Sequence, residues 1–458
     1  MAEPVVEGKG AMISHEKTRG GEWKIYRFTL LVLVAMGIIG LLVVEKSMAQ
    51  LTPNTVSYAI TGSAIPSGGR GFTPILSRDG IRAGPFRVHP FLGAGEIYTD
   101  NVFRTKSNRQ SDFVHIVSPG LQVQLPFAGK HQAVIDYRAT QLFSQRFSEN
   151  NVLRQDLTGQ VLLNFPGGLN LHLQGGYIKG FDLRGSAVDV QALEPTKWNT
   201  KTFVGEAETI GNQLGVRLRV QTTDWNYENN NQAPTRDRLS SRGNFTVFGL
   251  IAPKTFALLN FGVTRNLYDQ NTQLDSTNYN VNTGLRWRAT GKTNGEIQVG
   301  YTFLTFDHAP VLQPAGSPLS SGGTGSNILQ VSGNLTWQPT PRLTIGIRPF
   351  RTIRQSGVFG TSVFTQTSVN LTVRHAIGVR TTLNGNLRFS NNDFDNDQGN
   401  QSSQNREDNI LGAGIGVTYQ AVRWLGIRGQ YQYQQRNSTI NTFENYANTL
   451  MVSIQGVF

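Results

Sequence analysis

Arginine recurs at alternate positions in many segments of this chain whose intervening residues are apolar. Side chains two residues apart in an extended strand lie on the same face. A planar guanidinium binds a carboxylate, sulfate or phosphate through two parallel hydrogen bonds. The spacing therefore predicts a cationic wall that binds anions, formed by Arg138, Arg217, Arg219, Arg286, Arg288, Arg348, Arg354, Arg374, Arg388, Arg428 and Arg436.

Amide side chains lie between these arginines on the same predicted face, among them Asn280, Asn282, Asn334, Asn370, Gln298, Gln430 and Gln432. Amides hydrogen-bond to hydroxyl groups without requiring a charge. The clearest acids on this face are Asp136 and Glu296, so we expect most of the arginines to lack an acidic partner. Such a wall offers many weak contacts to an acidic, hydroxyl-rich polymer. The alternative is a polar lumen whose charges pair internally.

The segments that carry these residues have the period of β-strands. Leu329, Val331, Leu335 and Trp337 alternate with polar residues, and the stretch 427–436 alternates in the same way. Each run lasts about 10 to 14 residues, which is long enough for a tilted strand to cross a bilayer. The two faces of each strand therefore meet different environments, lipid on one side and water on the other.

Short and long connections alternate along the chain. The short ones lie at 127–130, 166–168, 211–213, 253–254, 290–293, 339–341, 375–378 and 421–423. The long polar ones lie at about 102–111, 147–153, 181–196, 226–236, 268–275, 308–324, 356–360, 391–405 and 438–444. They predict an all-β fold: a single closed antiparallel transmembrane barrel of 18 strands, or alternatively 16, with short periplasmic turns and long extracellular loops.

The composition agrees with a barrel in an outer membrane. Apolar residues make up 38% of the chain and charged residues 16%, with 50 glycines and no cysteine. Only the outward half of each strand of a barrel is apolar, whereas soluble α/β proteins have longer apolar runs. The absence of cysteine excludes a disulfide framework and lipid attachment at a processed cysteine. The net charge of +12 favours anionic partners, such as lipopolysaccharide phosphates or an anionic solute, and we expect no nucleic acid.

The amino-terminal region predicts export from the cytoplasm. A basic stretch precedes an apolar run from Phe28 to Val44, and Ser47-Met48-Ala49 has small residues at the two positions that a signal peptidase reads. We therefore expect a signal peptide over 1–49; an uncleaved anchor is the alternative. Residues 50–86 are rich in Gly, Pro, Ser and Thr and predict a flexible periplasmic tail before a barrel at 87–458.

The last residues of the chain have the pattern of a lipid-facing strand. Leu450, Val452, Ile454, Gly456 and Phe458 alternate with Thr449, Met451, Ser453, Gln455 and Val457. The pattern resembles the closing strand of bacterial outer-membrane barrels, in which a final aromatic residue acts as an assembly signal for the barrel assembly machinery. Gly456 departs from it, because a bulky residue is usual there. We therefore expect the protein to lie in the outer membrane of a Gram-negative cell.

The stretch from Pro90 to Phe103, PFLGAGEIYTDNVF, resembles the opening of the second family of β-barrel porins. Ser111-Asp112, Pro119-Gly120 and Tyr137 support the resemblance, which is strongest over about residues 88–180. It implies an outer-membrane barrel, and several members of the family are associated with exopolysaccharide synthesis and export. It implies no catalytic residues.

Other candidate sites are weaker. The stretch from Asp393 to Gly399 resembles the start of a calcium loop, but the glycine is one position late and position twelve is Gln404 rather than Glu. The seven histidines show no metal-ligand spacing. We expect no catalytic, cofactor or metal site, and the loops at 181–196 and 308–324 are candidate gates because of their length.

These patterns together predict a pore that exports an acidic exopolysaccharide, with energy supplied by a periplasmic export partner, because no nucleotide site is recognisable. Two alternatives remain. A general anion-preferring diffusion porin would have the same wall and need no partner. A structural or adhesive barrel would act through its outer loops.

Overall fold

The computed structural model describes residues 80–290, 292–308, 325–356, 363–394 and 406–458, with the side chains of 288–290 excepted. The predicted signal peptide, most of the predicted tail, nearly all of the candidate gate at 308–324 and most of the calcium-like loop lie outside these residues. Among the described residues, no helix is long and apolar enough to cross a membrane.

Nearly all of the described chain is strand. The strands are β1 (Ile81–Ala83), β2 (Phe86–Thr99), β3 (Asp112–Phe127), β4 (His131–Ser144), β5 (Val152–Asn164), β6 (Leu169–Phe181), β7 (Lys197–Ile210), β8 (Leu214–Tyr227), β9 (Arg238–Ala252), β10 (Thr255–Tyr268), β11 (Ser276–Thr290), β12 (Thr293–Phe306), β13 (Ser326–Thr340), β14 (Leu343–Gln355), β15 (Val363–Ala376), β16 (Thr381–Phe394), β17 (Arg406–Val422), β18 (Leu425–Ser438) and β19 (Asn445–Val457). The helices are short: α2 (Ala233–Arg236) and three 3-10 turns at Ser148–Asn150, Thr272–Leu274 and Asn441–Phe443.

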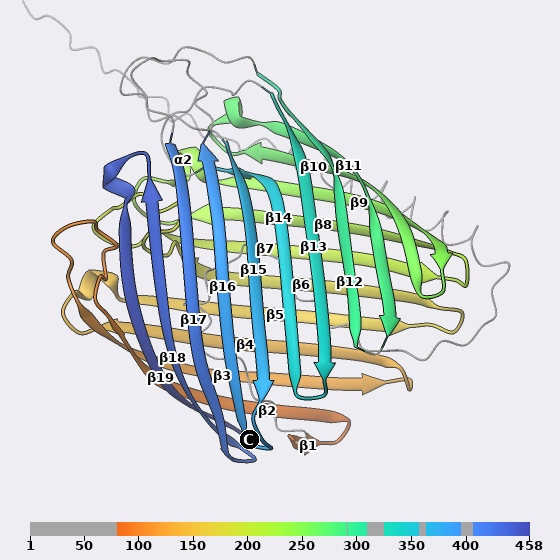
Figure 1. The fold of residues 1–458 in the computed structure, drawn as a ribbon, viewed down its shortest axis with the longest axis horizontal. Helices are drawn as coiled ribbons and strands as arrows, with labels where there is room; N and C mark the ends of the chain where they lie inside the picture. Colours follow the sequence, from red (N-terminus) through yellow and green to blue (C-terminus); the bar gives the residue numbers. More distant parts are fainter. Residues whose placement is uncertain (1–79, 291, 309–324, 357–362, 395–405) are drawn as a thin grey trace, which may run out of the picture. The chain divides into compact units, whose positions relative to one another are not determined.

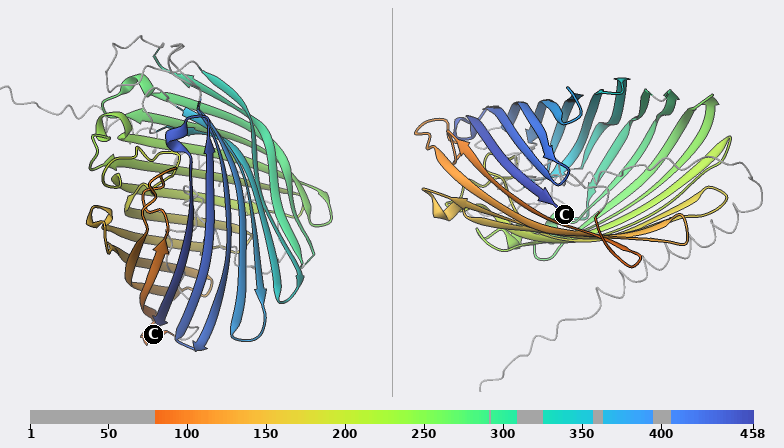
Figure 2. Two further views of the ribbon diagram at one scale, coloured as in Figure 1. Left: turned by 60° about the vertical axis from the view of Figure 1, so that its left-hand side comes forward. Right: turned by 90° about the horizontal axis from the view of Figure 1, so that it is seen from below.

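Strands β2 to β19 form one closed antiparallel barrel. Each pairs with the next along the chain, and β19 pairs with β2, so the predicted 18-stranded barrel is confirmed. In Figure 1 the strands of the near wall cross those of the far wall at a steep angle, which is the tilt that a closed barrel requires. Figure 2 shows the same strands from two further directions.

One short strand adds to this barrel. In β1, Ile81, Arg82 and Ala83 pair with Val88, Arg87 and Phe86 of β2. These residues belong to the segment for which the sequence predicts a tail, and three residues are too few to show a strand period. The β1 strand therefore extends the edge of β2 beyond the last residue that β19 reaches, Phe91.

The two faces of the wall differ in the way that the alternation predicts. On β19, Leu450, Val452 and Ile454 are 50%, 53% and 50% exposed, whereas Ser453 and Gln455 of the opposite parity are 3% and 5% exposed. Apolar residues on the outer face meet lipid, and polar residues turn inward. The same parity holds for most apolar residues of the other strands, for example with Ile135, Leu329 and Leu387 outward.

Aromatic residues gather at the short-turn end. Trp337 and Trp424 lie beside turns and are 51% and 48% exposed. The ring of Phe458 stacks on Trp424 with centroids 5.6 Å apart. Gly456 makes room for this contact, because a Cβ there would lie 3.3 Å from the Phe458 ring. The departure at Gly456 thus has a local packing reason, and the rings form an aromatic girdle at the membrane interface.

Candidate functional site: the lumen

The predicted arginines lie on the face opposite to the exposed apolar residues. Arg138 is on β4, Arg217 and Arg219 on β8, Arg286 and Arg288 on β11, Arg348 and Arg354 on β14, Arg374 on β15, Arg388 on β16, and Arg428 and Arg436 on β18. The side chain of Arg288 lies outside the described residues. Arg138 stands over the ring of Phe91 at 5.0 Å, and Arg348 donates to the Oδ1 of Asn334 at 3.1 Å.

Three of these arginines form ion pairs near the periplasmic end of the lumen. The Nε of Arg217 is 2.8 Å from Glu208, and the Nη1 of Arg286 is 3.1 Å from the same carboxylate. Glu296 lies 3.4 Å from Arg217 and 3.6 Å from Arg286. Arg219 pairs with Glu206 at 2.9 Å. We call these six residues the ion-pair cluster. Their charges cancel within it.

The expectation of few inward acids was therefore wrong. Besides Asp136 and Glu296, the inward face carries Glu206 and Glu208 on β7, Asp156 on β5 and Asp408 on β17, each paired with an arginine. The sequence of β7 hides the first two, because Phe203 and Val204 are adjacent and the apolar residues do not keep to one face. Val204 in fact turns inward and is 1% exposed.

An aromatic residue organises the ion-pair cluster. Phe248 of β9 is fully buried on the lumen side, and the guanidinium carbons of Arg217 and Arg286 lie 4.9 and 5.1 Å from its ring centroid. Cations are attracted to the face of an aromatic ring. The ring thus holds two arginines beside each other, and Glu208 bridges them.

Replacing Glu208 with Gln is expected to increase the barrel's preference for anions, roughly twofold in permeability ratio, because one bridging negative charge is lost from a narrow aqueous path. The reversal potential of the refolded chain under a KCl gradient measures this ratio. Asp224→Asn, on the outer face of β8, is the control. A shift toward cations would contradict the assignment of Glu208 to the permeation path.

A second group of arginines, on β9, β14 and β16, lies farther from the periplasmic end of the lumen and has no acidic partner among the described residues. Arg354 is repelled by the nearby guanidinium groups of Arg388 and Arg242. Arg242 donates to the hydroxyl of Thr264 at 3.0 Å, and Arg354 donates to the amide oxygen of Gln366 at 2.6 Å. The Nε of Arg388 is buried and has no hydrogen-bond partner among the described residues. We call Arg242, Arg354 and Arg388 the upper arginine cluster.

Arg242 was missed by sequence reasoning, although it has the same parity as Asn244 and Thr246 on β9. The signal was present but weak, because Phe248 on the inward face interrupts the alternation. Within the described part of the chain, no carboxylate forms an ion pair with the upper arginine cluster. Its hydrogen-bond partners there are neutral, so the described residues leave its three positive charges uncompensated.

Comparison with known proteins identifies the family. A family model described as Putative beta-barrel porin 2 matches residues 73–458. The chain belongs to this family. It is an outer-membrane β-barrel of the porin type, and the resemblance seen in the sequence is confirmed. No curated protein matches it.

Solved outer-membrane barrels are similar to 81% of this porin. OpdL of Pseudomonas aeruginosa is 10% identical, with 98% of that chain covered and a TM-score of 0.41. OccAB3 of Acinetobacter baumannii is 11% identical, with 99% covered and a TM-score of 0.41. A structure titled bacterial polysaccharide outer membrane secretin is 6% identical, with 97% covered and a TM-score of 0.34.

The outer mouth of the porin is partly covered by its own loops. The loop between β6 and β7 is fixed at its base, where Arg236 of α2 donates to Asp182 at 2.9 Å and Trp198 donates to Asp182 at 3.0 Å. Burial raises the pKa of the Asp182 carboxyl, and Arg236 opposes this change. A buried ion pair of this kind positions a loop more than it stabilises the fold.

The tip of the same loop reaches a loop from another sector of the barrel. Gln191 donates to the carbonyl oxygen of Thr442, which belongs to the loop before β19, at 3.0 Å. Arg184 holds the loop together through the carbonyls of Ala192 and Leu193. Beneath these loops Arg436 is 1% exposed and lies 3.7 Å from Asp408. Arg436 is therefore enclosed under the outer loops and does not line the open lumen.

Among the described residues, no group of three or more His, Asp or Glu side chains is placed to hold a metal ion. His115 faces outward, opposite Glu96 of the neighbouring strand, and His172 is buried on the lumen side. The polar groups described here are suited to binding and orienting anions along a path.

Proposed function

We propose that this porin is an anion-preferring pore through which an acidic, hydroxyl-rich exopolysaccharide leaves the cell. The observation that supports it best is the upper arginine cluster. Arg354 is repelled by two neighbouring guanidinium groups, and an anion that enters beside it relieves part of that repulsion. Inside a protein wall this effect exceeds that in bulk water. A polymer that carries many carboxylates forms the same favourable contacts repeatedly as it passes.

Neutral amides are available to hydrogen-bond to the hydroxyl groups of such a polymer. Asn280 and Asn282 both donate to the Oδ1 of Asn260, which in turn donates to Thr246 at 2.7 Å. This polar ladder runs across β9, β10 and β11 between the two charged clusters. It offers hydrogen bonds of moderate strength without a single deep site, which favours passage over retention. An export partner in the periplasm would supply the energy.

The runner-up is a general anion-preferring diffusion porin, which the same wall favours. The two proposals differ in how a polymer affects the current. We expect the refolded full chain in a planar bilayer to show an anion-selective reversal potential, and a polyuronate to block the current at concentrations at which a neutral dextran of equal length does not. An anion-selective current that the polyuronate leaves unchanged would favour the diffusion porin.

A third outcome would count against both pores. If the refolded barrel conducts no ions, the packing of loops over the outer mouth is complete, and a structural or adhesive role of these loops becomes the better proposal. Lack of ion selectivity in an open channel would contradict the role of the upper arginine cluster.

A further inference from the structure

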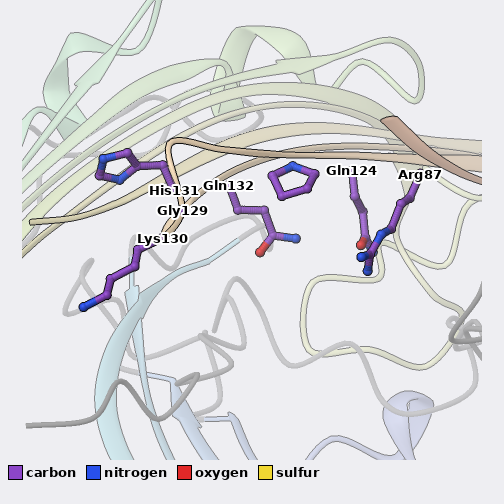
Figure 3. Close-up of a pocket in the computed structure, with 7 residues that line it drawn as sticks. Arg87, Gln124, Gly129, Lys130, His131 and Gln132 are labelled. Carbon is purple, nitrogen blue, oxygen red and sulfur yellow. The ribbon is translucent and has the colours of Figure 1, made fainter. Parts of the chain in front are cut away.

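A small basic cavity lies at the periplasmic rim, away from both charged clusters. It has a volume of about 260 Å³ and is lined by Arg87, Gln124, Pro126, Gly129, Lys130, His131 and Gln132. Figure 3 shows the side chains of Arg87, Gln124 and Gln132 extending from the wall toward the same side. None of the lining residues is acidic.

A second arginine stands beside the first. Arg82 of β1 is the direct cross-strand partner of Arg87 of β2, so their side chains share a face. Like charges opposite each other on neighbouring strands are destabilising. In the described part of the chain neither arginine forms an ion pair. Both residues are exposed, and an anion between them would relieve their mutual repulsion.

One amide of the cavity, that of Gln124, is linked to a nearby acid. Gln124 donates through Nε2 to the Oε1 of Gln122 at 2.6 Å, and Gln122 donates to Asp136 at 3.3 Å. This chain of amides uses one N–H of Gln124 and leaves its carbonyl oxygen free to accept from a hydroxyl group. Asp136 itself stays outside the cavity lining.

The cavity faces the lumen. Arg87 has the parity of Phe91, which is 3% exposed on the inner side, and not that of Leu92, which is 54% exposed on the lipid side. Its volume is just below the range of about 300–1,000 Å³ of sites that hold whole small molecules. It therefore has room for one unit of a chain that continues into the lumen.

We infer that this cavity is an entrance site that binds a carboxylated sugar unit of the polymer. Arg82 and Arg87 bind the carboxylate, and Lys130 adds a third positive charge. Gln124 and Gln132 hydrogen-bond to the hydroxyl groups. The inference rests on the proposed function, because it names where an acidic polysaccharide first binds. An acidic segment of a periplasmic protein would use the same cations, but a lumen-facing cavity of this size fits a sugar unit better.

The test is calorimetric titration of the full-length protein in detergent with tetragalacturonate. We expect Arg82→Gln with Arg87→Gln to weaken binding about tenfold, and Lys130→Gln alone to weaken it by roughly threefold, because bidentate contacts to a carboxylate are the strongest of the set. Arg342→Gln with Arg380→Gln, in two other periplasmic turns, removes the same charge elsewhere and should leave the affinity unchanged. Maltotetraose, which is uncharged, should not bind.

The outcomes separate this site from the pore itself. Unchanged affinity in both cavity variants, or no binding by the unmodified protein, overturns the entrance site. If affinity falls only when the upper arginine cluster is replaced, the entrance site is wrong and the proposed pore stands. If the cavity variants lose binding while the barrel shows no anion selectivity, the site stands and the proposed function fails. Tighter binding of a poly-glutamate peptide than of tetragalacturonate would show that the site binds an acidic protein segment and not a sugar unit.

Discussion

Replacing Arg242, Arg354 and Arg388 together with glutamine is expected to reduce the anion preference of this porin by about tenfold or more. At an effective dielectric constant of about 20, two unit charges about 7 Å apart interact by roughly 2 kcal/mol. A change of about 1.4 kcal/mol corresponds to tenfold in an equilibrium constant. Removing three uncompensated cations from one zone therefore exceeds the effect of removing any ion-paired arginine of the lumen.

The reversal potential of the refolded variant under a KCl gradient measures this prediction. The matched control is Arg342→Gln, Arg380→Gln and Arg423→Gln, which removes three arginines from periplasmic turns. The control is expected to keep most of the selectivity. Equal selectivity in the unmodified protein and in the cluster variant would show that ions do not pass these side chains. Glutamine keeps hydrogen-bonding capacity, so a change in selectivity reports charge.

The substitution Gly300→Ala is expected to prevent the barrel from closing. Gly300 lies on β12 opposite Asn282 of β11, and a Cβ there would lie 1.9 Å from the carbonyl oxygen of Val281. Gly284 makes the reciprocal approach, with Ile297. No side-chain movement relieves a clash with backbone, so the ladder between the two strands must part. We expect destabilisation by about 3 kcal/mol or more.

The measurement is the mobility of unheated protein in gel electrophoresis, where a folded barrel migrates differently from the unfolded chain. Gly412→Ala is the control, because Gly412 also faces the lumen and a Cβ there meets its nearest neighbour, the Cβ of Arg388, at 3.8 Å. Normal folding of Gly300→Ala beside normal folding of the control would mean that β11 and β12 are farther apart than the structure has them.

The order and spacing of strands and turns was the most predictable property of the chain. Each predicted short turn and long loop lies at a junction between consecutive observed strands, although several overlap strand ends, as residues 391–394 do in β16. The agreement arises because a closed barrel imposes one residue period on every strand and places polar segments at the rims. A three-residue strand such as β1 carries no period, and its pairing with β2 depends on where β19 ends. Sequence patterns contain no such information.

The lumen was less predictable, because parity is assigned from apolar residues and several of these turn inward. Phe248 and Val204 occupy the inner face, and they obscured Arg242 on one strand and Glu206 and Glu208 on another. Parity also cannot show which charges meet. Arg217 and Glu296 lie 79 residues apart in the chain, and their ion pair depends on the curvature of the wall.

Contacts between loops were beyond prediction for the same reason. The hydrogen bond from Gln191 to Thr442 joins residues that are 251 positions apart, in loops from different sectors of the barrel. Length alone suggested that the loop at 181–196 could act as a gate. Its internal hydrogen bonds and its anchor at Asp182 are specific to the folded state.

The junction of β19 with β2 has a mechanical consequence. Their register runs only from Thr449↔Thr99 to Val457↔Phe91, whereas β16 and β17 stay in register from Thr381↔Tyr419 to Phe394↔Arg406. Fewer ladder hydrogen bonds resist separation along this line than along the neighbouring ones, and local opening begins where such support is least. The ladder of β13 with β14 is also interrupted, between Ser332↔Phe350 and Leu335↔Ile347. Under lateral tension from the membrane, we therefore expect the wall to part first along one of these two lines.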